Sequence, residues 1–319
     1  MSDQPTSRRS FLFGRSFKGN DPWLRFLARL KRSCEGKVSL VKRDSAPLAR
    51  LEPARQEDVF HALSLCREYR VCMALDGLPL GGPDAQRPVL QVGAGKAWGT
   101  LMPAGEQVWR VQAGCPVQVM QAAGLAVHTW DGLPGQANLA QWIALLPVNS
   151  PPGTLGQYRI EAIEWLYPDG SIEVLGQFGV KDSQPLRSMA AQRSIPSLFQ
   201  LTADPLVEQW MQAGAHTGTE PQWPLRYRLD ALVARDGVEI NLAHLLLGHR
   251  GSLGWVVAAH IRSPGNGESS DASGSAACER GVDSVNLVDR LPEAREIDMK
   301  IKRAMDPDMV FLSCQDQTG

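Results

Sequence analysis

The sequence contains no pair of cysteines at C-x-x-C spacing and no histidine at metal-ligand spacing from a cysteine, although six cysteines occur in its 319 residues. Isolated thiols are typical of a reduced, cytosolic protein and do not form the pattern of a disulfide framework or a zinc site. We therefore expect no metal centre. The cysteines are Cys34, Cys66, Cys72, Cys115, Cys278 and Cys314.

The chain also lacks a net charge of one sign, a long apolar run and an internal repeat. Its 33 Lys and Arg balance 34 Asp and Glu, which argues against a general nucleic-acid-binding protein. No window is apolar enough to span a bilayer, so we expect no transmembrane segment. With 43% hydrophobic and 21% charged residues the chain can bury a core, and its length predicts two lobes or one large α/β unit with appendages.

The N-terminus carries a motif, Ser7-Arg8-Arg9-Ser10-Phe11-Leu12, that matches a twin-arginine export signal. Such a signal also needs an uninterrupted apolar run of roughly 7–15 residues and a cleavage site of small residues. Neither follows Arg9. We therefore expect a cytoplasmic protein that retains the motif, with export as the alternative.

The next segment, residues 23–33, has Trp23, Phe26, Leu27 and Leu30 at helical spacing, which predicts an amphipathic helix. Its other face is basic. A basic amphipathic helix either packs against its own domain or contacts a membrane surface or a partner, and the first is favoured here. The basic residues are Arg25, Arg29, Lys31 and Arg32.

Hydrophobic periodicity and turn residues predict the other elements along the chain. A helix begins at Pro53 and continues to Arg70, and a buried strand at 71–75 leads into a glycine-rich loop at 76–83. A hairpin joins strands 160–167 and 171–175 through an Asp-Gly turn. The pattern weakens between 177 and 225. Further strands are predicted at 89–92, 108–113, 125–129 and 225–233, and further helices at 116–123, 205–213 and 292–305.

One stretch, residues 241–262, organises the rest. It predicts the last turns of an apolar helix ended by Gly248, a tight loop with glycines at every third residue, and a strand from Gly254 to Ile261. Glycine permits positive φ and lets backbone amides approach a ligand closely. A plain helix end followed by a turn explains the same residues, and this segment alone leaves both interpretations open.

Several motifs, in this order, resemble the FAD-linked oxidases of the vanillyl-alcohol oxidase and p-cresol methylhydroxylase (PCMH) type, especially the FAD-binding subunit of glycolate oxidase. The first is the loop Asp76-Gly-Leu-Pro-Leu-Gly-Gly82, and the second is the segment from Gly132 to Ala144. The third is the stretch ending Gly251-Ser-Leu-Gly254. The fourth is Asp306-Pro-Asp-Met-Val-Phe311, which follows a helix.

The resemblance implies an α+β fold, the two-subdomain FAD-binding fold of the PCMH type, with the cap domain absent. It divides the chain into an N-terminal extension (1–46), the FAD-binding domain (47–262), a flexible Gly/Ser-rich linker (263–291) and a C-terminal helix with its tail (292–319). FAD would lie between the subdomains. Its linkage would be non-covalent, because the loop contains no His or Cys.

Carried over by position, the resemblance implies a set of FAD contacts with departures from the family pattern. Ala140 and Gln141 replace a glycine pair, Arg159 replaces an acid, and Asp76 places a carboxylate where a pyrophosphate would bind. The implied contacts are Gly77, Leu78, Leu80, Gly81, Gly82, Ala140, Gln141, Gly248, Gly251 and Ser252.

Catalysis by such an oxidase needs a base beside the flavin. His249 and Arg250 are weak candidates, and His128 is a further histidine near the second motif. Two functions follow. One is an FAD-binding oxidoreductase subunit that oxidises a 2-hydroxy acid such as glycolate with other oxidase subunits or an electron-transfer partner. The alternative is a flavin-free, catalytically inactive assembly or regulatory subunit.

Overall fold

The computed structural model describes residues 21–43, 46–80, 86–146, 151–179, 185–213, 223–234, 239–264 and 292–313. The export-like motif, Gly81, Gly82 and almost all of the predicted linker lie outside these ranges.

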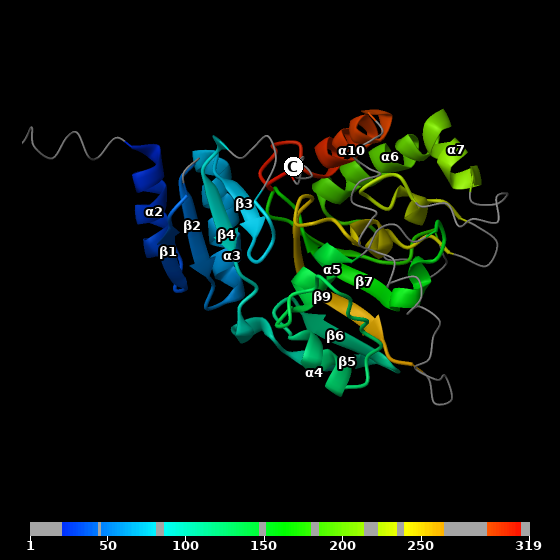
Figure 1. The fold of residues 1–319 in the computed structure, drawn as a ribbon, viewed down its shortest axis with the longest axis horizontal. Helices are drawn as coiled ribbons and strands as arrows, with labels where there is room; N and C mark the ends of the chain where they lie inside the picture. Colours follow the sequence, from blue (N-terminus) through cyan, green and yellow to red (C-terminus); the bar gives the residue numbers. More distant parts are fainter. Residues whose placement is uncertain are drawn as a thin grey trace, which may run out of the picture.

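The first sheet is built from the N-terminal part of the chain (Figure 1). Its strands lie in the order β1 (Lys37–Val41), β2 (Leu48–Glu52), β4 (Val89–Val92) and β3 (Cys72–Leu75). The pair β1–β2 is antiparallel, whereas β2–β4 and β3–β4 are parallel. The predicted strands at 71–75 and 89–92 are confirmed. Sequence patterns missed β1 and β2, because β1 is an exposed edge strand without clean alternation.

The second sheet is antiparallel throughout. Its strands lie in the order β5 (Leu101–Gly105), β6 (Val108–Gln112), β9 (Trp255–Arg262), β7 (Ile160–Leu166) and β8 (Ile172–Leu175). The predicted hairpin is the pair β7–β8, and the strand after the glycine loop is β9. Two sheets with helices packed against them make a mixed α+β fold, which confirms the predicted class at this coarse level.

Most of the helices agree with the sequence pattern. The predicted helices α2 (Pro22–Ser33), α3 (Gln56–Tyr69), α4 (Val117–Ala122), α7 (Pro205–Ala213) and α10 (Pro292–Met305) are confirmed. Sequence patterns missed α5 (Leu139–Leu145) and α6 (Met189–Thr202), and the second of these contains Pro196 in its interior.

Three predicted elements are wrong. Residues 125–129 form no strand, because the carbonyl of His128 accepts the Trp142 indole N–H (2.8 Å) instead of joining a ladder. Residues 225–233 fold into the short 3-10 helix Leu229–Leu232, where the buried ion pair between Arg228 and Asp230 (2.7 Å) fixes a turn. The apolar run before Gly248 forms the 3-10 helix Leu242–Leu246 rather than an α-helix.

The apolar face of helix α2 is buried inside the protein. Phe26, Leu27 and Leu30 are buried, and the helix packs chiefly against α3. Its apolar face is therefore not available for insertion into a membrane surface, and packing against its own domain is the alternative that holds. Within the described residues, we find no helix both long and apolar enough to cross a membrane.

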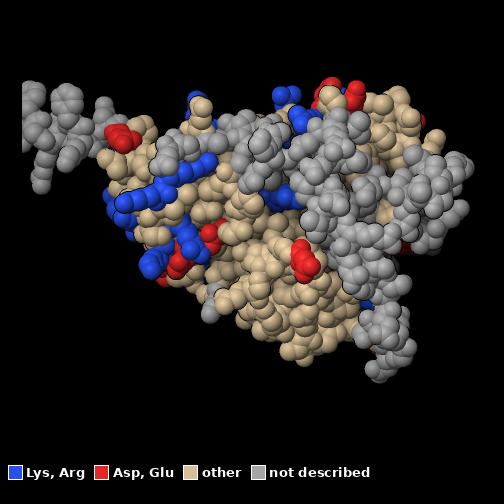
Figure 2. All heavy atoms as spheres, viewed as in Figure 1, with Lys and Arg blue, Asp and Glu red and all other residues tan. Residues whose placement is uncertain are grey.

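Charge is distributed unevenly between the two parts of the chain. Residues 1–98 hold an excess of Lys and Arg, whereas residues 99–319 hold an excess of Asp and Glu. On the face shown in Figure 2, basic side chains gather over the N-terminal sheet. The small net charge of the whole chain therefore conceals a basic lobe beside an acidic remainder.

The C-terminal tail joins the two lobes. After α10 the chain runs toward β3 (Figure 1), where Phe311 pairs in parallel with Met73. The Met73 amide donates to the carbonyl of Val310, and the Leu312 amide donates to the carbonyl of Met73, each at 2.8 Å. Residues from the far end of the described chain therefore extend the first sheet beyond β3.

Arg70 ends α3 in the left-handed region (φ 56°), which costs a non-glycine residue about 1 kcal/mol. We expect Arg70→Gly to raise the free energy of unfolding by about 0.5–1 kcal/mol, because the side chain is exposed and only the backbone strain is removed. Urea unfolding measures the change. Ser64→Gly, inside the same helix and also exposed, should lower stability by a similar amount. A loss of stability in Arg70→Gly would contradict this account.

Candidate functional site

The loop after β3 contacts α5 directly. Gly77 has φ +83°, and a Cβ at this position would overlap the side-chain nitrogen of Gln141. That nitrogen donates to the carbonyl of Asp76 (3.0 Å), while the Asp76 carboxylate forms an ion pair with Arg50. The positive φ favours glycine at position 77, and the Gln141 side chain would have to move to admit a Cβ there. The space above Gly77 is occupied by a side chain of the protein itself.

The first turn of α5 is fully hydrogen-bonded within the chain. The amides of Leu139 and Ala140 donate to the carbonyls of Cys115 (2.9 Å) and Ala113 (3.0 Å). Asn138 and Gln141 form a reciprocal capping box, in which the Gln141 amide donates to the Asn138 side chain (3.0 Å). A helix binds an anion through unpaired amides of its first turn, and here these amides are already paired.

The other end of α5 is capped by the second glycine loop. The amides of Gly248 and Arg250 donate to the carbonyls of Ile143 and Ala144, both at 2.9 Å. Gly251 has φ +71°, and a Cβ there would lie 3.2 Å from Cβ of Leu75 and 3.3 Å from Leu78. The loop therefore packs against the end of β3 without a gap at this point.

His249 is buried within this loop rather than presented to solvent. Its Nδ1 accepts the Gly251 amide (3.0 Å), and its ring packs edge-on against Trp165 at 5.0 Å between centroids. Burial lowers the pKa of His249 to about 3, so the ring is neutral at pH 7. The Nε2 atom has no hydrogen-bond partner among the described residues. The predicted candidate base therefore acts here as a packed core residue.

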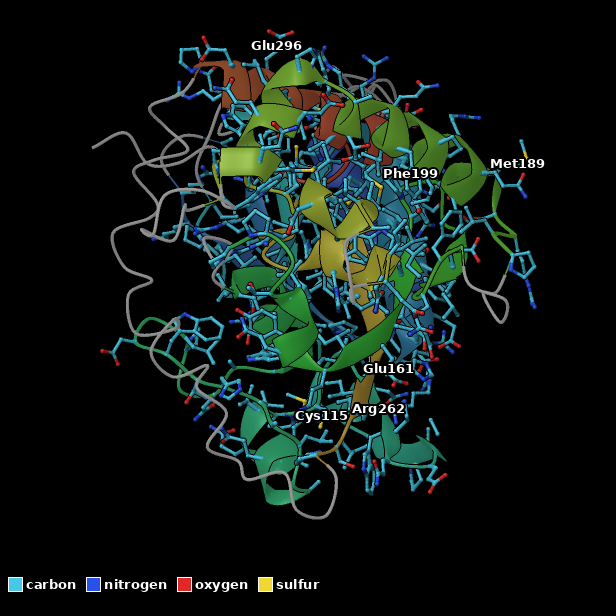
Figure 3. The ribbon with its side chains drawn as sticks, turned by 90° about the vertical axis from the view of Figure 1, so that its right-hand side faces the viewer. Cys115, Glu161, Met189, Phe199, Arg262 and Glu296 are labelled. Carbon is cyan, nitrogen blue, oxygen red and sulfur yellow. The ribbon has the colours of Figure 1, made fainter. Side chains whose placement is uncertain are left out.

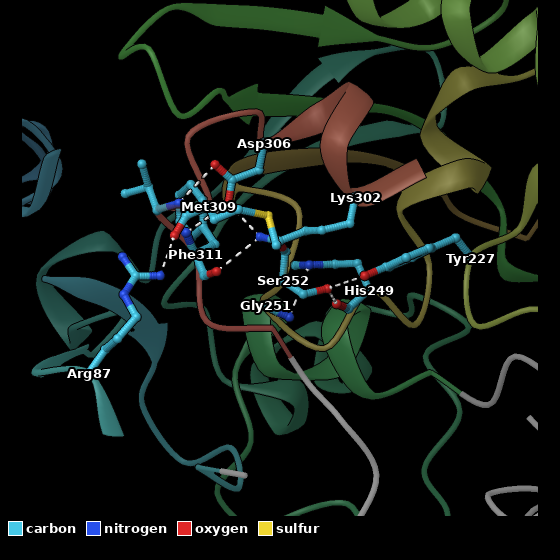
Figure 4. Close-up of polar contacts among 10 residues, drawn as sticks. Arg87, Tyr227, His249, Gly251, Ser252, Lys302, Asp306, Met309 and Phe311 are labelled. Atoms are coloured by element: carbon cyan, nitrogen blue, oxygen red, sulfur yellow. Dashed lines mark hydrogen bonds and ion pairs between the residues drawn. The ribbon is translucent and has the colours of Figure 1, made fainter. Parts of the chain in front are cut away.

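The glycine loop contributes Ser252 to a buried polar cluster that also contains Lys302, Asp306 and Tyr227 (Figure 4). Lys302 forms an ion pair with Asp306 and donates to the carbonyls of Ser252 and Phe311. The Asp306 carboxylate accepts the amides of Val310 (3.0 Å) and Phe311 (2.8 Å). The Ser252 hydroxyl contacts the Tyr227 hydroxyl at 2.9 Å. This cluster fixes the tail to the glycine loop.

The structure places the remaining predicted contacts as follows. Ala140, Gly248 and Ser252 are buried, and Arg250 is half-buried with φ +50°. The carbonyl of Leu80 accepts a hydrogen bond from Arg43 (3.4 Å). Gly81 and Gly82 lie outside the described residues. The predicted segments are therefore brought together, but by direct contact with one another.

FAD does not fit the described part of this cradle. A pyrophosphate needs several unpaired amide donors and no carboxylate beside them. Asp76 supplies a carboxylate, and the backbone amides of most of the predicted contact residues already donate hydrogen bonds to acceptors within the chain. Those amides belong to Leu78, Ala140, Gln141, Gly248, Gly251 and Ser252.

A separate cavity of about 410 Å³ lies at the end of the second sheet, where β7 begins and β9 ends. Arg159, Glu161, Gln157 and His244 contribute to its lining, together with Arg262, which forms an ion pair with Glu161. Figure 3 shows Glu161 and Arg262 beside each other. Sequence patterns single out His128, Arg159 and the stretch 241–262 separately but do not bring them together, because the residues of this site come from separate segments.

The second sheet also carries a polar network across three strands. Arg110 on β6 makes two hydrogen bonds to Glu164 on β7 (both 2.6 Å), and His260 on β9 contacts the same carboxylate at 3.1 Å. Burial opposes ionisation of Glu164, but hydrogen bonds from His260 and Arg110 outweigh it and lower its pKa to about 2. Glu164 is therefore an anion at pH 7.

Comparison with known proteins identifies no relative by sequence. No family model matches the chain, and no curated protein matches it significantly. Among solved structures, FgChi7B is similar at 12% identity with a TM-score of 0.39, over 76% of this chain and 43% of that one. Alkyldihydroxyacetonephosphate synthase is similar at 12% identity with a TM-score of 0.35, over 68% of this chain and 32% of that one. The chain spans less than half of either protein, and similarity at this level does not assign a function.

Lys302→Met should lower the free energy of unfolding by about 3–5 kcal/mol, because it leaves the buried Asp306 without its counter-ion. Denaturant unfolding measures the loss. The matched control is Lys300→Met in the same helix, which breaks an exposed pair with Glu296 and should cost less than about 0.5 kcal/mol. Equal effects of the two substitutions would refute a special role for the buried cluster.

Glu164→Gln should destabilise the protein by about 1–3 kcal/mol at pH 7, because charge-assisted hydrogen bonds from Arg110 and His260 are lost. The folded-state pKa of Glu164 is depressed, so its contribution is present above the unfolded pKa near 4.5 and disappears as pH falls through about 2. Unfolding curves from pH 2 to 7 should show wild type and variant converging at the acidic end. A difference independent of pH would contradict the assigned pKa.

Proposed function

We propose that this chain is a flavin-free, catalytically inactive subunit that acts in the assembly or regulation of an enzyme complex. The observation that carries the proposal is the closed hydrogen bonding of α5. Both ends of this helix, where the resemblance to FAD-linked oxidases expects the cofactor, bond to other segments of the chain. A dinucleotide would have to break several of these bonds before it gained any of its own.

Electrostatics point the same way. The Asp76 carboxylate stands beside Gly77, and a pyrophosphate there would face a like charge. Arg50 neutralises Asp76 by an ion pair, so that arginine is not available for a phosphate without exposing the repulsion. The same ion pair explains why an aspartate is tolerated at position 76. Asp76 anchors the loop after β3 to β2 and does not serve to hold a ligand.

The basic N-terminal lobe supports the assembly role. Its excess of Lys and Arg, beside the acidic remainder of the chain, suits docking against an acidic protein surface. Other oxidase subunits or an electron-transfer protein are the proposed partners, with the resembled family as the basis.

A second candidate, an FAD-binding oxidoreductase subunit acting on a 2-hydroxy acid, has one observation in its favour. Arg43 donates from Nη2 to the carbonyl of Leu80, while its buried Nη1 has no hydrogen-bond partner among the described residues. A buried, unsatisfied guanidinium N–H beside the β3 loop is a group that a phosphate would satisfy.

FAD binding separates the two candidates. We expect the purified chain to be colourless and to show no saturable quenching of flavin fluorescence when it is titrated with FAD, because the amides that would hold the pyrophosphate are paired. Circular dichroism on the same sample establishes that the protein is folded.

The variant Arg43→Met serves as the discriminating arm. Stoichiometric yellow flavin, or saturable FAD binding that Arg43→Met weakens at least tenfold, would overturn the proposal and establish the second candidate. Absence of binding in both the wild type and the variant, with unfolding curves that show intact folding, would support the flavin-free function.

A further inference from the structure

The first sheet has two edges, and within the described residues the chain covers only one of them. The tail pairs with β3 through Phe311 and Met73, whereas β1 is the strand at the opposite edge (Figure 1). No other described segment bridges to β1, and its described backbone hydrogen bonds are those of the ladder with β2. The N–H and C=O groups of β1 that point away from β2 are therefore open to another strand.

The geometry of β1 suits the addition of a strand. It pairs with β2 in continuous antiparallel register from Lys37 to Val41, without a bulge or a proline. Leu40 and Val41 are 64% and 38% exposed, so apolar side chains stand uncovered on both faces of the strand. Edge strands are commonly protected by bulges, prolines or charged side chains. Lys37 is the only charged residue within β1, which leaves the strand able to accept a neighbour.

Exposed lysines stand at both ends of this edge. Lys37 begins β1 and Lys42 follows it directly, and neither forms an ion pair with a described residue. Glu52 lies opposite Lys37 in the ladder but contacts Arg50 instead (4.0 Å). A complementary strand is therefore acidic. Pairing of β1 with β1 of a second copy would place the lysines of both copies on one ladder, which opposes self-association.

From these observations we propose that β1 binds an extended, acidic segment of a partner protein, which joins the first sheet as an additional strand. Main-chain hydrogen bonds to β1 supply affinity, and Lys37 and Lys42 select a segment with carboxylates near its ends. This inference rests on the proposed assembly function, because it names the surface by which the basic lobe holds its partner. The FAD titration does not involve β1. A chain that binds neither FAD nor an acidic strand would keep the flavin-free function and lose only this interface.

Fluorescence anisotropy with the labelled peptide Glu-Thr-Val-Thr-Val-Thr-Glu tests the proposal on the full chain. Its two terminal glutamates can reach Lys37 and Lys42 in either strand direction. We expect saturable binding in the millimolar range or below, with slower hydrogen exchange at residues 37–41 when the peptide is bound. Two control peptides should not bind. One has lysine in place of both glutamates, and the other has proline in place of both valines, which prevents pairing as a strand.

Lys42→Glu should weaken binding of the acidic peptide by about fivefold or more, because it replaces an attraction with a like-charge contact. Arg70→Glu is the matched control. It makes the same change of charge at an exposed position in the same lobe, but Arg70 precedes β3 at the opposite edge of the sheet. At physiological salt it should leave the affinity unchanged. Unfolding curves establish that both variants are folded.

Several outcomes would overturn the proposal. These are no saturable binding of the acidic peptide, equal binding of the lysine peptide, or equal losses of affinity in the two variants. Light scattering that finds a dimer, with exchange at residues 37–41 slowing as the chain concentration rises, would identify a second copy as the occupant. Slow exchange at these residues in the free monomer at every concentration would show that the chain itself covers the edge.

Discussion

The buried contact between Lys302 and Asp306 is the interaction on which the arrangement of the two lobes depends. A buried charge pair is tolerated only where the remaining donors and acceptors are satisfied. Here Lys302 also bonds to the carbonyls of Ser252 and Phe311, and Asp306 accepts two tail amides. The pair therefore specifies one geometry in which α10, the glycine loop and the edge of the first sheet meet. Apolar residues of equal volume would fill the space but would not make these directional hydrogen bonds.

A second constraint is the closure of α5 at both ends. In an open fold of this kind a helix N-terminus beside a glycine loop is a ready site for a phosphate. Here Asn138 and Gln141 cap one end, and the amides of Gly248 and Arg250 cap the other. The glycines therefore allow the loop backbone to pack closely against side chains of neighbouring elements. The same sequence features that bring a cofactor close to a chain also bring two parts of a chain close to each other.

Much of the fold could be predicted from the sequence, because long apolar stripes and the Asp-Gly hairpin are local signals. The helix from Pro22 and the pair β7–β8 are examples. The candidate site could not be predicted to the same extent. Gln141 was recognisable as an unusual residue, but its bond to the carbonyl of Asp76 joins segments far apart in the chain. The position of His249 beside glycines suggests a site, whereas its burial against Trp165 depends on tertiary packing. The cavity around Arg159 has no sequence signature, since its walls come from several separate segments.

The pairing of Phe311 with Met73 has a consequence for how the protein is made. During synthesis β3 leaves the ribosome long before the tail residue Phe311 is made. Until then the β3 edge of the first sheet remains unpaired. Contacts between residues so distant in sequence form late and slow the folding of a domain. In that interval the edge of β3 presents unpaired backbone groups beside apolar side chains, which are the features that make a strand edge prone to association. We therefore expect the tail to complete the first sheet late in folding.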